Sequence, residues 1–266
     1  MKELCADLLA EYQALAELAA TMSPAQWDKK TQFYGWTPWD EIAHLCFFDE
    51  TGLLAATDAA AFADNTRELQ QELDKGTEIS AITRKRFGHL DGAQLLALWQ
   101  ERFNALVTAL ATMDPKARLP WYGPMMSARS FATARMMETW AHGQDVYDCL
   151  GVRRPATDRL KHIAHIGATT FGWTFVNRKL PVPEVKPYIA LRAPGGDTWT
   201  WNEASDRDYV RGSAEDFCLV VTQRRNVRDT QLEYAGDVAS AWLPIAQCFA
   251  GPPAHGPAPG VRAIHY

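Results

Sequence analysis

The 266-residue sequence lacks several features that mark specialised classes of protein. No segment approaches the roughly 20 consecutive apolar residues of a membrane-spanning helix, so we expect no membrane partner. Lys and Arg (27) do not outnumber Asp and Glu (32), and the net charge is −5. Nucleic-acid binding usually needs clustered cations, so we expect no nucleic-acid partner. The first residues, MKELCADLLAEYQAL, are acidic and amphipathic, unlike a signal peptide, which predicts a cytoplasmic protein.

Cysteine is also sparse, and its pattern excludes two further classes. The five cysteines are odd in number and widely spaced, and no two of them form a CxxC pair. A disulfide framework and a cysteine zinc site are therefore not expected, and we interpret the cysteines as reduced core residues. Hydrophobic residues (47%) and charged residues (22%) occur at the frequencies of an ordinary folded protein long enough for two modest domains.

The first part of the sequence has the apolar periodicity of long helices. Thr37-Pro38, with Asp40 three residues after Thr37, is typical of a helix start, and Gly151 is typical of a helix end. A polar segment, 58–87, is also expected to be helical, with a break near Gly76. Long helices with short loops predict an antiparallel four-helix bundle. The four segments that would form it are 2–21, 38–56, 91–113 and about 127–151.

The pattern changes after the proline-marked segment PVPEV (181–185). Short strand-like segments, separated by Gly and Asp, alternate there with the helix-like segments 214–225 and 237–249. The sequence therefore predicts an α+β fold class with two domains. Residues 1–180 would form the helical bundle, and residues 181–266 a smaller α+β domain.

Three residues have the spacing of a metal site. Glu138 and His142 are four residues apart on a predicted helix, so their side chains share one face. His44 lies within an apolar segment, where a metal is one way to satisfy its ring nitrogens. Three such ligands leave a coordination position open, as catalytic zinc sites do. Asp49 and Asp145 are candidates for supporting groups or for additional ligands. By spacing alone, a surface charge pair and a histidine bonded to a carbonyl group are the commoner explanations of the pattern.

Two motifs, GWTPWDEIAHL (35–45) and ARMMETWAHGQDV (134–146), resemble the paired signature of the DinB-like bundle in mycothiol-dependent maleylpyruvate isomerases and their metal-binding relatives. Residues 212–225 and 237–253 are similar to the C-terminal domain of that family, so the resemblance spans nearly the whole chain. It implies that His44, Glu138 and His142 bind a divalent metal, with zinc as the first expectation and nickel or iron as alternatives.

The resemblance implies a metal-dependent enzyme in which the metal activates a thiol or a water molecule. The reaction would be isomerisation of, or addition to, a small electrophilic and carboxylated substrate, with a low-molecular-weight thiol as possible cosubstrate. The segments LPWYGPMMSARSF and FCLVVTQRRN are more typical of a separate branch, which leaves the substrate open. One alternative is a hydrolase of a small amide or ester, with Asp145 or Glu138 as base. Another is a non-catalytic ligand-binding protein that the metal stabilises. Either a monomer or a homodimer is compatible with the sequence.

Arginines and aromatic residues complete the candidate site. Arg135, one turn before Glu138, could pair with a substrate carboxylate or with an acidic residue of a neighbouring helix. Arg224 and Arg225 end a predicted helix and could reach the site or simply favour the helix dipole. Trp121 and Tyr122, in a Pro/Gly-rich loop, are candidates for the wall of a substrate pocket.

Overall fold

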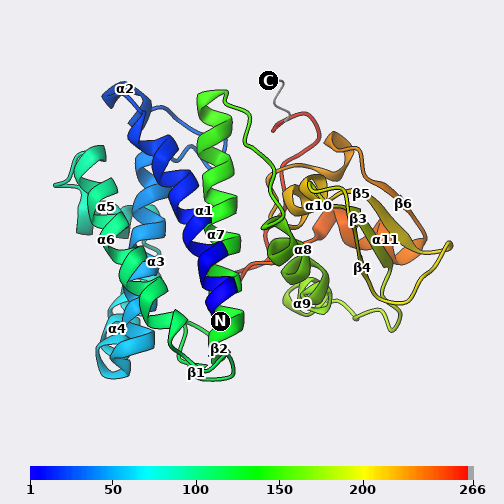
Figure 1. Cartoon of the computed structure of the whole chain (residues 1–266), viewed down its shortest axis with the longest axis horizontal. Coiled ribbons are helices and arrows are strands. Elements are labelled where there is room, and N and C mark those ends of the chain that lie inside the picture. The colour runs from blue at the N-terminus through cyan, green and yellow to red at the C-terminus, as the bar shows by residue number, and fades with distance from the viewer. Residues whose placement is uncertain (263–266) are drawn as a thin grey trace. The chain divides into compact units, whose positions relative to one another are not determined.

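The computed structural model describes residues 1–262 and divides into two compact units, Met1–Val152 and Arg153–Tyr266 (Figure 1). Helices predominate, and the described strands form two small sheets, so the predicted α+β class is confirmed. Among the described residues, no helix is both long enough and apolar enough to cross a membrane.

The first unit, all of whose residues are described, is built on four long helices (Figure 1). Helix α1 packs against α6 and α7, and helix α3 packs against the same two partners. These helices begin and end within a few residues of the predicted segments; they are α1 (Lys2–Ala20), α3 (Pro38–Thr57), α6 (Gly92–Ala111) and α7 (Ala128–Leu150). The shorter elements are α2 (Pro24–Trp27), α4 (Ala59–Asp74), α5 (Ile79–Phe87), β1 (Arg118–Leu119) and β2 (Met126–Ser127).

Local sequence explains where α3 and α7 begin and end. Thr37 and Asp40 form a capping box, in which the Thr37 Oγ1 accepts from the Asp40 amide over 3.3 Å and Asp40 Oδ2 accepts from the Thr37 amide over 2.9 Å. A cap of this kind stabilises a helix start by about 1 kcal/mol. Helix α7 begins after the capping residue Ser127 and ends at Gly151, whose φ of 67° favours glycine. The caps therefore fix the start of each helix that carries a candidate ligand.

The second unit combines helices with a four-stranded sheet. The sheet has the order β4-β3-β5-β6, in which β3 pairs parallel with β5 and antiparallel with β4, while β5 pairs antiparallel with β6. Helix α10 packs against α8 and against the sheet. The elements are α8 (Leu160–Thr169), α9 (Phe171–Asn177), β3 (Tyr188–Arg192), β4 (Thr198–Trp201), β5 (Tyr209–Ser213), α10 (Ala214–Val221), β6 (Glu233–Ala235) and α11 (Asp237–Trp242), with 3-10 turns at Val227–Asp229 and Leu243–Ile245.

The units divide at residue 152, whereas the sequence analysis placed the domain boundary near residue 180. The difference arises from α8 and α9, which the contacts assign to the second unit. The approach of Gly167 on α8 to Val221 on α10 shows why, since a Cβ at residue 167 would lie 2.8 Å from the valine side chain. Apolar periodicity predicts that α8 has a buried face, but it does not identify the helix that covers that face.

Candidate metal centre

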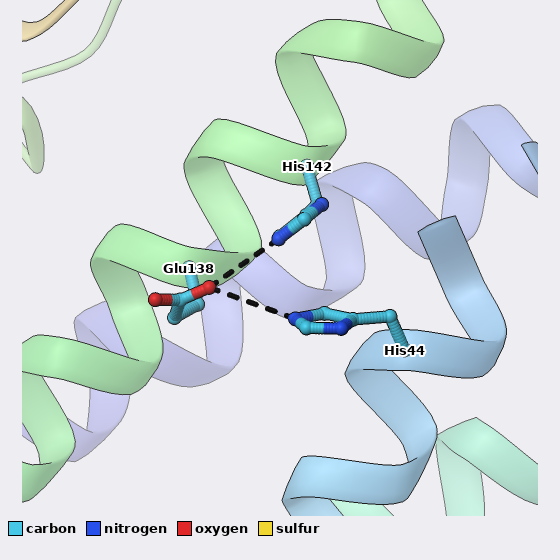
Figure 2. A group of neighbouring side chains, drawn as sticks. All are labelled: His44, Glu138 and His142. Atoms are coloured by element: carbon cyan, nitrogen blue, oxygen red, sulfur yellow. Dashed lines mark ion pairs between the residues drawn. The ribbon is translucent and has the colours of Figure 1, made fainter. Parts of the chain in front are cut away.

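His44 on α3 and Glu138 and His142 on α7 converge on one point (Figure 2). Glu138 Oε2 lies 3.3 Å from His142 Nε2 and 3.7 Å from His44 Nε2. One donor atom from each residue lies within 4.8 Å of the other two. The side chains of Glu138 and His44 are 24% and 14% exposed, whereas that of His142 is 6% exposed. The structure therefore brings together the three predicted ligands and leaves two of them accessible, while their binding of a metal stays a prediction.

The charges at this point suit a cation. Burial alone would raise the pKa of Glu138, but hydrogen bonds and charge interactions with His142 and His44 hold that pKa well below its usual range. Two imidazole nitrogens and one carboxylate oxygen are a donor set that zinc and its transition-metal neighbours prefer. The residues therefore fit a divalent metal ion.

Aromatic rings surround both histidines. The Trp36 ring stacks on His142 with a centroid distance of 5.9 Å and lies 5.4 Å from His44. Phe33 meets His142 edge-on at 5.3 Å, and Phe48 lies 4.8 Å from His44. These rings displace water from the imidazoles, which strengthens electrostatic interactions between the charged groups. Trp36 belongs to the motif that we identified in the sequence, but its spacing there gives no sign of this contact.

The other nitrogen of His142 has a partner that the sequence analysis missed. His142 Nδ1 lies 2.7 Å from Oε2 of Glu41, a fully buried residue of α3. The donor atoms of Glu41, His142 and Asp145 also lie within 4.8 Å of one another. Asp145 thus groups with Glu41 and His142 and is not part of the cluster formed by His44 and Glu138. Its predicted role as a base stays a prediction.

Arg135 forms an ion pair with an acidic residue of a neighbouring helix, one of the two readings of the sequence. Its Nε donates to Asp49 Oδ1 over 2.8 Å, and the residue is only 3% exposed. Burial alone would lower the pKa of Arg135, but the charge of Asp49 raises it above its usual value. Its Nη2 is buried and finds no hydrogen-bond partner among residues 1–262. Arg135 therefore stays charged, and its Nη2 is a buried donor.

Trp121 and Tyr122, in the loop between β1 and β2, lie one aromatic contact away from His44. Their ring centroids are 6.2 and 5.6 Å from that of Phe48, which itself packs on His44. The hydroxyl of Tyr122 donates to Asn65 Oδ1 over 2.8 Å, and burial raises the pKa of Tyr122 to about 12. Their predicted role in a substrate pocket is compatible with this position and stays a prediction.

Arg224 and Arg225 follow α10 in the second unit, and both are buried. The Nη1 of Arg224 donates to the Thr222 carbonyl over 2.9 Å, and the Nη1 of Arg225 donates to the Arg224 carbonyl over 2.7 Å. These bonds to carbonyl groups are the interaction that cations commonly make at the end of a helix. Their predicted contribution to the site stays a prediction.

None of the chain's cysteines is placed to act as a thiolate. All five are buried and free of disulfides. The cysteine nearest in sequence to His44 is Cys46, and burial, followed by the charges of Asp49 and Glu50, raises the pKa of its thiol far above its usual value. A nucleophilic thiol at this site would therefore have to come from another molecule.

The chain matches a family model and is similar in sequence to known proteins. Residues 8–147, more than half of the chain, match the family model described as "Mycothiol maleylpyruvate isomerase N-terminal domain". Two uncharacterized proteins, from two strains of Mycobacterium tuberculosis, are each 42% identical over 256 residues, which cover 94% of this chain and 96% of each relative.

The fold also resembles that of a solved protein. The crystal structures of the mycothiol-dependent maleylpyruvate isomerase and of a histidine-to-alanine mutant of it match with a TM-score of 0.53. Each match covers 82% of this chain and 87% of the solved chain at 14% identity. At this identity the likeness shows a shared fold.

Proposed function

The chain belongs to the family that carries the mycothiol maleylpyruvate isomerase N-terminal domain, and we propose on this basis that it is a metal-dependent, thiol-using enzyme. Its reaction would be isomerisation of, or addition to, a small electrophilic and carboxylated substrate. The observation that carries the proposal is the convergence of His44, Glu138 and His142, with two of the three side chains partly exposed. An accessible set of three ligands is typical of catalytic metal sites.

His44 and His142, each through Nε2, and the Glu138 carboxylate would hold the metal, with zinc first and nickel or iron as alternatives. A divalent ion at this point lowers the pKa of a thiol or water bound beside it and so supplies a nucleophile near neutral pH. Trp36, Phe33 and Phe48 limit the access of bulk water to the two imidazoles.

The burial of all five cysteines favours a thiol that enters from solution. A low-molecular-weight thiol as cosubstrate agrees with the description of the solved relative as mycothiol-dependent. Arg135 is the proposed contact for a substrate carboxylate, because its charged guanidinium lies one turn before Glu138 and its Nη2 has no partner among residues 1–262. Since Nη2 is buried, this contact requires the site to open when the substrate binds. Trp121 and Tyr122 would extend the aromatic wall that begins at Phe48.

The proposal is tested by turnover of the full-length, zinc-loaded protein. Maleylpyruvate and related cis-unsaturated carboxylates would be supplied with mycothiol, with glutathione or with no thiol. We expect turnover that requires both a thiol and His44, so that His44→Ala is inactive. His89→Ala, which removes an exposed histidine of the same unit, is the matched control and should keep wild-type activity. Zinc-dependent hydrolysis of small amides or esters that needs no thiol would instead support the hydrolase.

A further inference from the structure

His142 has a carboxylate at each of its ring nitrogens. Its Nε2 lies 3.3 Å from Glu138 within the candidate metal site, while its Nδ1 lies 2.7 Å from Oε2 of Glu41. The two carboxylates come from different helices, Glu138 from α7 and Glu41 from α3. The imidazole is therefore fixed from both ends by groups on the two helices that supply the ligands.

Glu41 is itself held in place. It is 0% exposed, and its second oxygen, Oε1, accepts from the hydroxyl of Thr31 over 3.2 Å. Thr31 is buried as well, and its amide donates to the Trp36 carbonyl over 2.7 Å. A continuous series of contacts thus runs from the segment 31–36 through Glu41 to His142.

Coordination chemistry explains why a metal-binding His142 would need these contacts from Glu41 and Thr31. A histidine that binds a metal through Nε2 carries its proton on Nδ1 and needs an acceptor there. For His142, Glu41 is that acceptor, at the distance of a strong charge-assisted hydrogen bond. We propose that Glu41 is a positioning residue, which sets the tautomer and the ring orientation of His142 and is supported by Thr31. This inference rests on the proposed function, because it assumes that His44, Glu138 and His142 bind a metal.

The position of Glu41 on α3 strengthens the inference. Glu41 and His44 are three residues apart and so lie on neighbouring turns of the same helix face. Helix α3 therefore provides one ligand directly and supports a second ligand on α7. The rings of Phe33 and Trp36 pack on His142 but offer no directional acceptor to its Nδ1. Of these three contacts, the hydrogen bond with the Glu41 carboxylate is the one that fixes the orientation of the imidazole ring.

The test measures zinc affinity of the full-length protein by competition with a chromogenic chelator. Glu41→Gln keeps the size of the side chain and is expected to lower zinc affinity about 10- to 100-fold, the usual effect of losing such a partner. Glu50→Gln is the matched control, since Glu50 is another carboxylate of α3 that pairs with Arg86 over 2.6 Å and belongs neither to the helix cap nor to the candidate site. Its zinc affinity should equal that of the wild type.

A spectroscopic measurement distinguishes an effect on the tautomer and orientation of His142 from a general loss of stability. In the zinc-loaded wild type, proton–nitrogen correlation spectra of labelled histidine should show His142 with its proton on Nδ1. In Glu41→Gln this resonance should shift strongly, while the signals of His89, which is exposed and lies outside the cluster, stay in place. An unchanged His142 resonance in that variant would contradict the inference.

Two further variants, Thr31→Val and Asp145→Asn, also test the role of Glu41. Thr31→Val removes the hydroxyl that holds Glu41 and should weaken zinc binding less than Glu41→Gln does, without changing the number of ions bound. If Glu41→Gln does not fold, wild-type affinity in Thr31→Val overturns the inference. If Asp145→Asn lowers the affinity and Glu41→Gln does not, Asp145 is the support and the inference fails. A wild type that binds no zinc refutes the proposed function itself.

Discussion

Asp49 on α3 and Arg135 on α7 form a buried ion pair, in which the Arg135 Nε donates to Asp49 Oδ1 over 2.8 Å. The other oxygen of Asp49 accepts from the indole of Trp99 on α6 over 2.8 Å. Tyr12 on α1 donates to the same carboxylate. One buried carboxylate therefore joins the four long helices, and the ion pair lies one turn before Glu138.

The first prediction concerns this ion pair. Asp49→Asn leaves the buried guanidinium of Arg135 without its counterion. Arg135→Met leaves the buried carboxylate of Asp49 without its counterion. Each change should lower the free energy of unfolding by about 3–5 kcal/mol, whereas the double variant should lose less than the sum. Urea denaturation of all four proteins measures this. Glu72→Gln, which breaks exposed pairs with Lys75 and Lys85, is the control and should cost at most about 1 kcal/mol. Additive losses would show that the pair is not coupled.

The second prediction concerns metal removal. The wild type purified without chelator should carry one zinc ion per chain by elemental analysis, and His44→Ala should lose it. Both the chelated wild type and the variant should still unfold cooperatively on heating, because none of the three ligands belongs to the apolar core or to the hydrogen-bonded group of Asp49, Tyr12, Trp99 and Arg135. Loss of the folding transition on chelation would instead favour the non-catalytic protein that the metal stabilises.

The third prediction concerns thiol reactivity. All five cysteines are buried, and burial raises the pKa of the Cys46 and Cys218 thiols far above the usual value. Because the thiolate is the reactive form, the native protein should not react with Ellman's reagent within minutes, and five equivalents should react in denaturant. A fast-reacting thiol in the native state would point to nucleophilic catalysis by the chain itself.

The fourth prediction concerns alkaline pH. Burial raises the pKa of Tyr122 to about 12, above the value of about 10 for an unfolded tyrosine. The folded state therefore binds this proton more tightly. The resulting stability is present below about pH 10 and is lost as the pH rises to about 12. The difference in unfolding free energy between the wild type and Tyr122→Phe should shrink over this range in urea denaturation. A difference that is independent of pH would show that the hydroxyl ionises normally in the folded state.

The sequence predicted the helices of the first unit well because their ends carry strong local signals. The capping box of Thr37 and Asp40 marks the start of α3, and Gly151 marks the end of α7. The strands β1 and β2 were not predicted, since two residues each are too short to show an alternating pattern. The last predicted helix, 237–249, is in fact six residues of α-helix followed by a 3-10 turn. Pro244 explains the early end, because it cannot donate to the preceding turn.

Only part of the site could be predicted from the sequence, because several of its contacts are made between residues of different helices. The convergence of Glu138 and His142 follows from their spacing on one helix. His44 was proposed from its place in an apolar segment, and the family motif grouped it with the other two. Glu41 was missed because an acidic residue in the first turn of a helix is already explained by the helix dipole. Only the packing of α3 on α7 shows that its carboxylate reaches His142.

The spacing of Glu41 and His44 also restricts how this protein can diverge. One residue inserted or deleted between them would turn one side chain about 100° around the helix axis relative to the other, so the ligand and the support of the second ligand could not both face α7. Substitution at the intervening Ile42 and Ala43 does not change the angle between residues 41 and 44 around the helix axis. Relatives that keep the chemistry can therefore vary in residue type at positions 42 and 43 but not in length between 41 and 44. An insertion there in a homologue would be a sign that its centre has been lost or rebuilt.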